Sequence, residues 1–597
     1  MYDIKLDPSR DDKMTAFGKS TLQDRYLLPG ETIQEAFGRV ACAYADDEAH
    51  AQRIYDYMSQ LWFAPSTPVL VNGGAKRGLP ISCFLNEVED SLAGITGTWM
   101  ENVWLAAKGG GIGTSWSNVR SIGEKVGRVG KTSGIIPFIR VQDSLTMAIS
   151  QGSQRRGAAA CYLSVSHPEI EEFIELRRPQ GGDPNRKALF LHHGVVISDA
   201  FMEAVEKDEQ WDLKSPVTGE VMSTVSARDL WIRILTARVE TGEPYLLFID
   251  TVNRAIPEYH KEQGLEVGMS NLCCEITLPT GRDQHNKMRT AVCCLSSVNF
   301  DTYDQWKDNE LFIEDLLRML DNVLQDFIDR APEEMATARY AALRERSVGL
   351  GAMGFHSFLQ QKGIPFESVM AKVWNKKLFK HLRDSADAAS VKLAEERGPC
   401  PDAAEALVKE RFSNKLAIAP NASSSIYCGN VSPGIEPLAA NSFTQKTLDG
   451  SFNVRNKYLK GVLASHNRDD DETWSMITTS EGSVQMLDFL TDAEKDLFKT
   501  AFEFDQRWIV EHAADRAEFI CQAQSVNLFL PADVHKSELH SLHFNAWKKG
   551  VKSLYYCRSK SIRRAQVVSF ADAGKNKLAA METKQDEPKY EECLACQ

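Results

Sequence analysis

The fold class is indicated by the stretches VVISDAFMEAVEK (195–207) and SARDLWIRILTARVETGEPYLLFI (226–249). The first begins with three apolar residues that predict a buried strand, and Ser198 then caps a helix with an apolar stripe. The second opens a helix at Ser226, stops it at Gly242 and ends in an apolar run typical of another strand. Strand, helices and strand in this order predict the parallel crossover of an α/β fold.

The sequence on either side of this unit shows two different patterns of apolar residues. Before about Ile81 the apolar residues have helical spacing, as after Asp47, so we predict a helical region over residues 1–78. From there on, short apolar runs alternate with capped helices, which predicts one α/β domain over residues 79–574. Within it, a long helix is expected over Thr491–Phe502.

The composition excludes several classes of protein. The 597 residues carry 69 Lys and Arg against 82 Asp and Glu, a net charge of −13, which argues against a nucleic-acid-binding surface. No segment approaches the roughly 18 apolar residues of a membrane span, and the start has no signal-peptide core. We therefore expect a cytoplasmic protein without nucleic-acid or membrane partners, whose 13 cysteines are mostly reduced thiols.

Cysteines stand in two apolar, β-prone stretches, SNLCCEITLP (270–279) and AVCCLSSVNF (291–300). Inert buried thiols are the commoner outcome in such stretches, and that interpretation remains open here. However, Asn271 and Glu275 flank Cys273 at two residues on each side, so in an extended segment the three side chains share one face. An amide, a thiol and a carboxyl could then bind a hydroxyl-bearing substrate, although the spacing does not name the reaction.

The last 23 residues, 575–597, are polar and mixed in charge, so we predict a mobile tail. It ends with Cys593 and Cys596, for which three interpretations compete. A zinc site would need further His or Cys ligands, which the tail lacks, and exposed thiols without a role are generally avoided. We therefore favour a redox-active dithiol.

Two loops and a tyrosine pair complete the candidates. Hydroxyls and free N–H groups over Pro420–Ser425 suit a phosphate site, but equally a solvated turn. The basic loop Arg177–Lys187 could lie near phosphates, though a solvated surface loop is commoner. In a strand, Tyr555 and Tyr556 would point to opposite faces, one buried and one exposed.

Together these segments resemble the large, catalytic subunit of class I ribonucleotide reductases, from about Ala64 to the last residue. The resemblance implies a ten-stranded α/β barrel with a central finger loop, and a ribonucleoside-diphosphate reductase that makes 2′-deoxyribonucleotides. It further implies that Cys273 becomes a thiyl radical and removes the ribose 3′ hydrogen. The chain itself would bind no metal or other resident cofactor, because a metal-containing, ferritin-like small subunit supplies the radical.

The resemblance also assigns roles around this cysteine. Cys83 and Cys293 match the pair that supplies the reducing electrons, Asn271 matches the residue that anchors a hydroxyl, and Glu275 matches the base for the 3′ hydroxyl. Loss of water leaves a deficit of two electrons, which a dithiol can supply while becoming a disulfide. The redox tail would then reduce this disulfide and be reduced in turn by thioredoxin or glutaredoxin.

The remaining matches concern radical transfer and nucleotide binding. Tyr555 and Tyr556 match two stacked tyrosines through which the radical enters. The residues that match the substrate site are Thr67, Ser82, Ser423, Ser424 and Ser425. Asp90, Arg120 and the loop Arg177–Lys187 match a site at a homodimer interface where a deoxynucleotide or ATP selects the substrate.

Some features depart from the family. Only 82 residues precede Cys83, so we expect no N-terminal ATP cone and no overall ATP/dATP switch in this chain. The extra thiols Cys274, Cys294 and Cys557 receive no role, and the phosphate loop lacks the acidic residue of many relatives. Two alternatives remain at this point: an adenosylcobalamin-dependent reductase, which needs no tyrosine relay, and a non-catalytic nucleotide-binding or zinc-stabilised scaffold.

Overall fold

The crossover unit predicted around residue 195 is present in the computed structural model. It consists of β9 (His192–Ile197), α8 (Asp199–Lys207), α9 (Ala227–Thr241) and β12 (Tyr245–Phe248), with the two strands parallel. The hydroxyls of Ser198 and Ser226 cap the two helices, and Gly242 ends the second with a φ of 84°. Between the helices lies a hairpin that the sequence did not predict, β10 (Gln210–Lys214) with β11 (Val221–Ser226).

The structure describes residues 2–75, 78–128, 130–151, 155–178, 181–447, 450–531 and 533–559. The predicted redox tail, including Cys593 and Cys596, lies outside these ranges.

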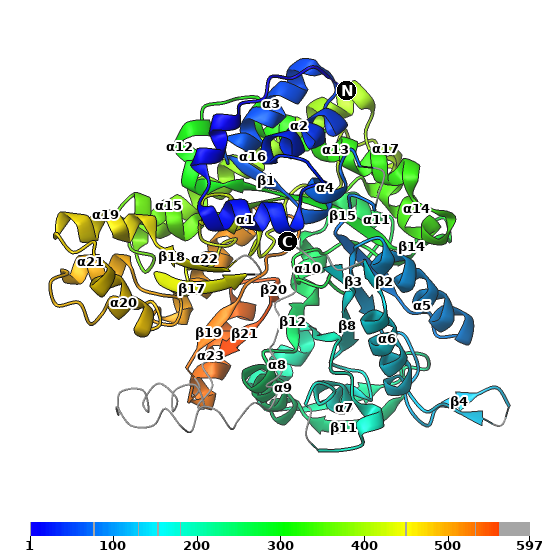
Figure 1. Cartoon of the computed structure of the whole chain (residues 1–597). Coiled ribbons are helices and arrows are strands. Elements are labelled where there is room, and N and C mark those ends of the chain that lie inside the picture. Colours follow the sequence, from blue (N-terminus) through cyan, green and yellow to red (C-terminus); the bar gives the residue numbers. More distant parts are fainter. Residues whose placement is uncertain are drawn as a thin grey trace.

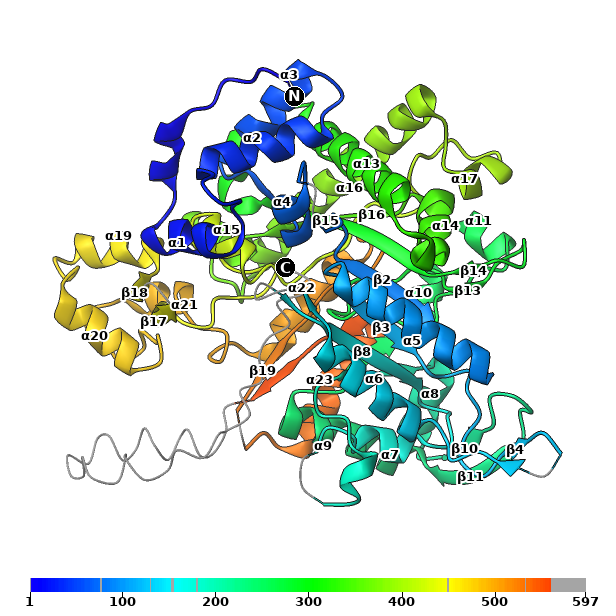
Figure 2. The same ribbon diagram turned by 45° about the vertical axis from the view of Figure 1, so that its right-hand side comes forward.

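This unit belongs to a strongly curled, mixed sheet of nine strands within the described residues (Figures 1 and 2). Its order is β1-β15-β2-β3-β8-β9-β12-β20, with β16 paired to β15. The remaining bounds are β1 (Phe63–Pro65), β2 (Cys83–Glu87), β3 (Gly111–Ser115), β8 (Ala158–Ser164), β15 (Ala291–Asn299), β16 (Val348–Met353) and β20 (Ser553–Leu554). The strands from β2 to β12 run parallel, as the predicted α/β class requires.

Backbone hydrogen bonds continue from β16 toward the other end of this sheet. Leu350 N donates to Lys415 O at 2.8 Å, Ile418 N donates to Ala523 O at 3.1 Å, and Tyr555 N donates to Val526 O at 2.8 Å. The segments 415–418 and 522–526 therefore lie between β16 and the chain that follows β20.

The N-terminal part of the chain is helical, as expected, and packs against the sheet near β1 and β15 (Figure 1). Its helices are a short 3₁₀ turn (Pro8–Lys13), α1 (Ala16–Arg25), α2 (Ile33–Tyr44), α3 (Glu48–Ser59) and α4 (Thr67–Asn72). Asp47 caps α3, whose Ile54, Tyr57 and Met58 are buried as predicted. Leu61 lies beyond the end of this helix, at a φ of 62°.

Further helices cover the outside of the curled sheet (Figure 2). The longer ones are α5 (Leu92–Ala107), α6 (Ile136–Ala148), α13 (Phe312–Arg330), α14 (Ala336–Glu345), α16 (Val369–Arg397), α22 (Gln506–Ala517) and α23 (Lys536–Lys548). Shorter ones are α7 (Ile170–Ile174), α10 (Ile249–Ala255), α11 (Glu258–Glu262), α12 (Tyr303–Trp306), α15 (Phe355–Gln361), α17 (Pro401–Glu405) and α18 (Ser424–Tyr427). No helix of the described ranges is both long and apolar enough to cross a lipid bilayer.

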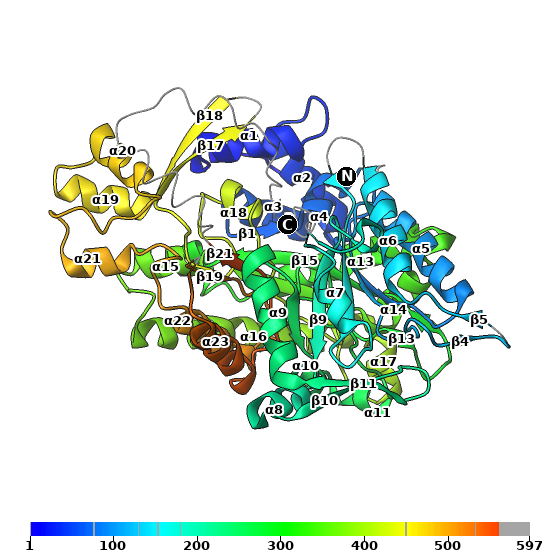
Figure 3. The same cartoon turned by 90° about the horizontal axis from the view of Figure 1, so that it is seen from below.

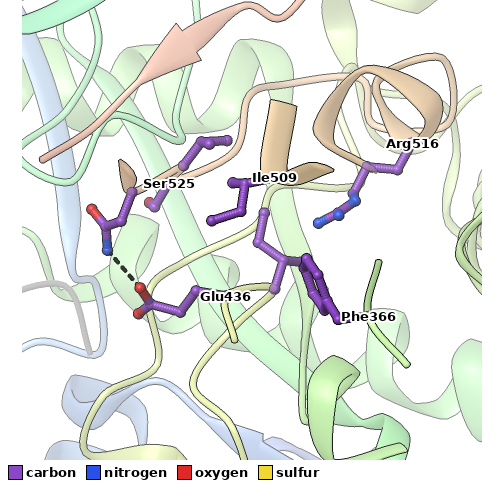
Figure 4. Close-up of a pocket in the computed structure, with 8 residues that line it drawn as sticks. Phe366, Glu436, Ile509, Arg516 and Ser525 are labelled. Carbon is purple, nitrogen blue, oxygen red and sulfur yellow. Dashed lines mark hydrogen bonds between the residues drawn. The ribbon is translucent and has the colours of Figure 1, made fainter. Parts of the chain in front are cut away.

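A smaller unit over residues 442–498 protrudes from the rest of the molecule (Figure 3). Its buried apolar side chains, Trp474 among them, form a cluster of their own. It contains β17 (Ser442–Thr447), β18 (Gly450–Arg455), α19 (Lys457–Ser465), α20 (Asp471–Thr479) and α21 (Asp492–Leu497). The expectation of a long helix from Thr491 to Phe502 is wrong, since only its capping box and first turns form. Side-chain amides end it, because Gln360 and Asn441 donate to the carbonyls of Leu497 and Phe498.

Candidate active site

A buried loop, residues 270–278, runs inside the curl of the sheet, and each of its side chains is at most 2% exposed. On one wall, the Tyr162 hydroxyl donates to Asn271 O at 2.6 Å. Gly113 on the neighbouring strand comes so close that an added Cβ would lie 1.9 Å from Ser270 O. On the opposite wall, Ala523 N donates to Glu275 O at 2.9 Å. The two walls therefore fix the backbone on either side of Cys273.

The loop is a turn and not the extended segment that the sequence suggested. Cys274 has a φ of 65°, and Asn271 Oδ1 accepts the backbone N–H groups of Glu275 and Ile276 at 3.0 and 3.1 Å. The side-chain amide thus caps the turn that carries Cys273. The predicted convergence of amide, thiol and carboxyl arises from this turn, and not from the alternation of side chains along a strand.

Cys83 and Cys293 lie directly opposite each other on the antiparallel strands β2 and β15. Residues in this relation have Cα atoms about 4.5 to 5.5 Å apart and side chains on the same face. That separation lies within the range of about 4.4 to 6.8 Å found in disulfides. Both cysteines are fully buried here, and the pair can exist as a dithiol or become a disulfide without a change of strand register.

This cysteine pair is joined to the buried loop by hydrogen bonds. Asn271 Nδ2 donates to Cys83 Sγ at 3.3 Å, and the Cys83 thiol lies 4.0 Å from Glu275 Oε1. On the other cysteine, Gln522 Nε2 donates to Cys293 Sγ at 3.7 Å. Ser525 binds the loop itself, since its hydroxyl donates to Cys273 O at 2.6 Å and lies 3.3 Å from Glu275 Oε2.

Burial favours the neutral forms of Glu275 and Cys293. Desolvation raises the pKa of Glu275 well above its ordinary value, and the neighbouring Cys83 adds to this effect. The pKa of Cys293 is likewise raised by burial and by the nearby Cys294 and Cys83. At neutral pH the Cys293 thiol is therefore protonated, and the ionised form of Glu275 is a stronger base than an exposed glutamate.

The tyrosine pair leads from this loop toward the surface. Tyr555 is 2% exposed and its hydroxyl donates to Cys273 Sγ at 3.4 Å, while Tyr556 is partly exposed. Their ring centroids are 4.2 Å apart. The two rings contact each other and do not lie on opposite faces, because the residues lie in the link between β20 and β21 (Cys557–Ser559) and not within a strand; the expected difference in burial is nevertheless present. Tyr245, which the sequence analysis did not single out, lies 4.8 Å from Tyr555, centroid to centroid.

The residues matched to the substrate site lie on three separate segments of the chain. Ser82 is fully buried beside Cys83, whose thiol donates to its hydroxyl at 3.4 Å. Thr67 is the first residue of α4. Ser423, Ser424 and Ser425 stand at the start of α18, and the loop before them is tied to the sheet because Ser297 Oγ donates to Asn421 Oδ1 at 3.0 Å.

The residues matched to an effector site form ion pairs. Arg120 binds the Asp90 carboxylate through two nitrogens, at 2.5 and 3.0 Å. Partial burial disfavours the charged form of Asp90, but these hydrogen bonds outweigh it and lower its pKa. In the loop 177–187, Arg177 lies 3.3 Å from the buried Glu243 and Lys187 Nζ donates to Glu175 O at 3.0 Å. In the parts of the chain that are described, no three His, Cys, Asp or Glu side chains lie close enough together to hold a metal ion.

Sequence reasoning missed the side chains that hold the site in place. Gln522, Ser525 and Tyr162 contact the loop or the cysteine pair from strands and segments far away in the chain. No local pattern marks them as functional, because their importance comes only from which wall of the sheet they occupy.

Cys273 on the buried loop and the pair Cys83 and Cys293 belong to one buried cluster inside a curled α/β sheet, an arrangement that suits a thiol-dependent oxidoreductase. Two family patterns match the chain: "Ribonucleotide reductase, all-alpha domain" over residues 12–78, and "Ribonucleotide reductase, barrel domain" over 81–410 and 402–557. The chain belongs to the ribonucleotide reductase family, as a large subunit of class I. Its activity is that of a ribonucleoside-diphosphate reductase, an oxidoreductase of deoxyribonucleotide synthesis.

Curated relatives match along nearly their whole length. The large subunit from Invertebrate iridescent virus 3 is 42% identical, covering 94% of this chain and 96% of the relative. A putative large subunit from Frog virus 3 is 44% identical, covering 95% and 96%. Among solved structures, the Actinobacillus ureae class Id ribonucleotide reductase alpha subunit superposes with a TM-score of 0.82 at 32% identity, covering 95% of this chain and 99% of that one.

Proposed function

We propose that Cys273 is the radical residue of this reductase and that Cys83 and Cys293 are its reducing dithiol. The observation that carries the proposal is the register of β2 and β15, which sets the two cysteines opposite each other at the buried loop. In the reaction, the Cys273 thiyl radical takes the 3′ hydrogen of the ribose. Glu275 takes the proton of the 3′ hydroxyl, and Asn271 holds a sugar hydroxyl.

The electrons and atoms of this scheme balance at the dithiol. The 2′ hydroxyl leaves as water after taking a proton from the cysteine pair. The two thiols together give two electrons and two protons and become one disulfide. One proton leaves in the water, and the other forms the new C–H bond at the 2′ carbon together with the electrons. Cys273 then returns its hydrogen to the 3′ carbon and is a thiyl radical again. The raised pKa of Glu275 makes its carboxylate a stronger base for the proton of the 3′ hydroxyl, and it returns that proton to the 3′ oxygen before the next turnover.

We further propose that the sheet is a ten-stranded barrel and that the buried loop is its central finger. The nine-stranded order together with the hydrogen bonds through 415–418 and 522–526 supports this arrangement, since those bonds link β16 to Tyr555 after β20. Counting around the ring, the strands are β15, β2, β3, β8, β9, β12, β20, 522–526, 415–418 and β16. The helical region 1–78 and the barrel domain 79–574 are the domains of this proposal.

The radical would reach Cys273 through Tyr556 and Tyr555. The continuous contacts from the partly exposed Tyr556 to the Cys273 thiol support this route. A class I large subunit relies on a small subunit that generates the radical, and we propose a ferritin-like, metal-containing protein for this partner. No metal or other resident cofactor is assigned to the present chain.

Nucleotides would bind at two places. Ser82, Thr67 and Ser423–Ser425 would hold the ribose and diphosphate of the substrate, through hydroxyls and the N–H groups at the start of α18. Asp90 and Arg120 would help to bind a deoxynucleotide or ATP as specificity effector at a homodimer interface. Apolar side chains exposed on α5 and α6 support such an interface, namely Leu92, Met100, Val141 and Met147.

The tail 575–597 would return electrons to the dithiol. We propose that Cys593 and Cys596 exchange with the disulfide of Cys83 and Cys293 and are reduced in turn by thioredoxin or glutaredoxin. This step gives the enzyme a route for reductant to a pair of thiols that are fully buried in the barrel.

The decisive experiment measures reduction of a ribonucleoside diphosphate with and without a second protein chain. Turnover is expected only with a radical-generating small subunit, and Tyr556→Phe should abolish it while the fold is retained. The adenosylcobalamin-dependent alternative makes the opposite prediction, since it requires no tyrosine relay and no such partner. Undiminished turnover of Tyr556→Phe with adenosylcobalamin alone would overturn the proposal.

A further inference from the structure

Tyr26 connects the N-terminal helical region to both segments that are proposed to hold the substrate diphosphate. It caps the end of α1 and is 2% exposed. Its hydroxyl lies 3.2 Å from Oγ1 of Thr67, at the start of α4. Its ring meets that of Tyr427, the last residue of α18, edge-on at 5.6 Å between centroids. A single side chain therefore touches the two segments that face the same ligand in the proposal above.

The backbone of α1 is in direct contact with α18 as well. An added Cβ at Gly18 would lie 3.1 Å from both Ile426 O and Tyr427 Cα, so only a glycine permits this approach without a shift. Figure 3 shows α1 and α4 near α18, which precedes the protruding unit that contains β17. Because the two helices touch through their backbones, α18 is fixed relative to Tyr26 and not only relative to the sheet.

The direction of the hydrogen bond between Tyr26 and Thr67 follows from the ligand. Diphosphate oxygens only accept hydrogen bonds, so a Thr67 hydroxyl that binds them must donate its single proton. Its lone pairs are then free to accept, which makes the Tyr26 hydroxyl the donor. A hydroxyl that accepts one bond while donating another is a better donor, because hydrogen bonds in a chain polarise one another.

We propose that Tyr26 is a positioning residue for the substrate diphosphate. It acts by orienting the Thr67 hydroxyl and by fixing the position of α18. The inference rests on the proposed substrate site, and it gives the helical N-terminal region a part in substrate binding. Tyr26 does not touch the reacting atoms, so its loss should weaken binding and leave the chemical step nearly unchanged.

The test is a double-mutant cycle with Tyr26→Phe, Thr67→Val and the double variant in the full holoenzyme. KM and kcat for CDP are measured, together with the Kd of CDP for the large subunit. Tyr26→Phe should raise KM and Kd about three- to tenfold, the worth of one hydrogen bond, with kcat within about twofold. In the Thr67→Val background the same change should have no further effect, because its partner is already gone.

Tyr55→Phe is the matched control. Tyr55 is a fully buried tyrosine of the same helical region whose hydroxyl bonds Gln34 and Asp7 instead. Its loss should lower the thermal midpoint but leave KM unchanged. An equal effect of Tyr26→Phe in both backgrounds, or a KM like that of Tyr55→Phe, would overturn the inference. If Thr67→Val itself leaves CDP binding unchanged, the proposed diphosphate site fails instead.

Discussion

Gly113→Ala tests whether the position of the buried loop controls catalysis. Gly113 lies in β3 with an ordinary strand conformation, so alanine fits its own backbone. The added Cβ, however, would lie 1.9 Å from Ser270 O and 2.9 Å from the Asn271 Cα, and contacts below 3.0 Å essentially do not occur. Both atoms belong to backbone, so no side chain can swing away. The loop must therefore move by about 1.1 Å or more, and Cys273 moves with it.

A displacement of this size should cost about a hundredfold in kcat, because a misplacement near 1 Å has that effect on reactions that need aligned groups. The assay is deoxynucleotide formation by the holoenzyme, with thermal unfolding as the check on the fold. Gly461→Ala in α19 is the control, since nothing lies within 4 Å of its added Cβ and helix propensity favours alanine. Wild-type kcat for Gly113→Ala, in a variant that is folded, would refute the view that the strand wall positions Cys273.

Three further outcomes are expected. Cys273→Ser should abolish turnover but keep the Kd of the substrate within about tenfold, roughly 1.4 kcal/mol, because the thiol acts on the transition state; residual turnover would remove it from the mechanism. Cys593→Ser with Cys596→Ser should give one burst of product from pre-reduced enzyme and no thioredoxin-driven cycling, and repeated turnover with thioredoxin would show the tail to be dispensable. Glu275→Gln should flatten the pH dependence of unfolding. Burial raises the Glu275 pKa in the folded chain, so its contribution to stability falls as pH rises above the ordinary value near 4.5, by at most about 1.4 kcal/mol per pH unit. Urea unfolding of both proteins between pH 5 and 8 measures this, and parallel curves would contradict the raised pKa.

Local patterns in the sequence were sufficient for several elements of the fold. The caps at Ser198 and Ser226 and the parallel strands on either side of their helices are as predicted, because capping and apolar periodicity act within a few residues. The helix after Thr491 is shorter than predicted, since the amides that end it, from Gln360 and Asn441, come from elsewhere in the chain. Element ends that depend on tertiary partners are invisible to periodicity.

In the site, too, some residues could be recognised from the sequence, whereas the contacts between them depend on the fold. The residues around Cys273 could be named from the sequence, but their convergence was predicted from strand alternation and is produced by a turn with Cys274 at positive φ. The pairing of Cys83 with Cys293 depends on the register of two strands about 210 positions apart, which no local pattern specifies. Their partners Gln522 and Ser525 are recognisable only once the sheet has curled around the loop.

The chain has two pairs of adjacent cysteines, 273–274 and 293–294, and the positions of their sulfurs have a consequence for disulfide formation. Cys294 follows Cys293, yet its thiol donates to Leu320 O of α13 on the outer side of β15, at 3.4 Å. The alternation of side chains along β15 thus keeps the Cys294 thiol away from Cys83. In the other pair, the positive φ of Cys274 turns the backbone directly after Cys273. An enzyme that makes and breaks a disulfide in every cycle risks locking itself in a wrong one. In the proposed cycle, the geometry of a single strand excludes the nearest competitor, so repeated oxidation would lead back to the bond between Cys83 and Cys293.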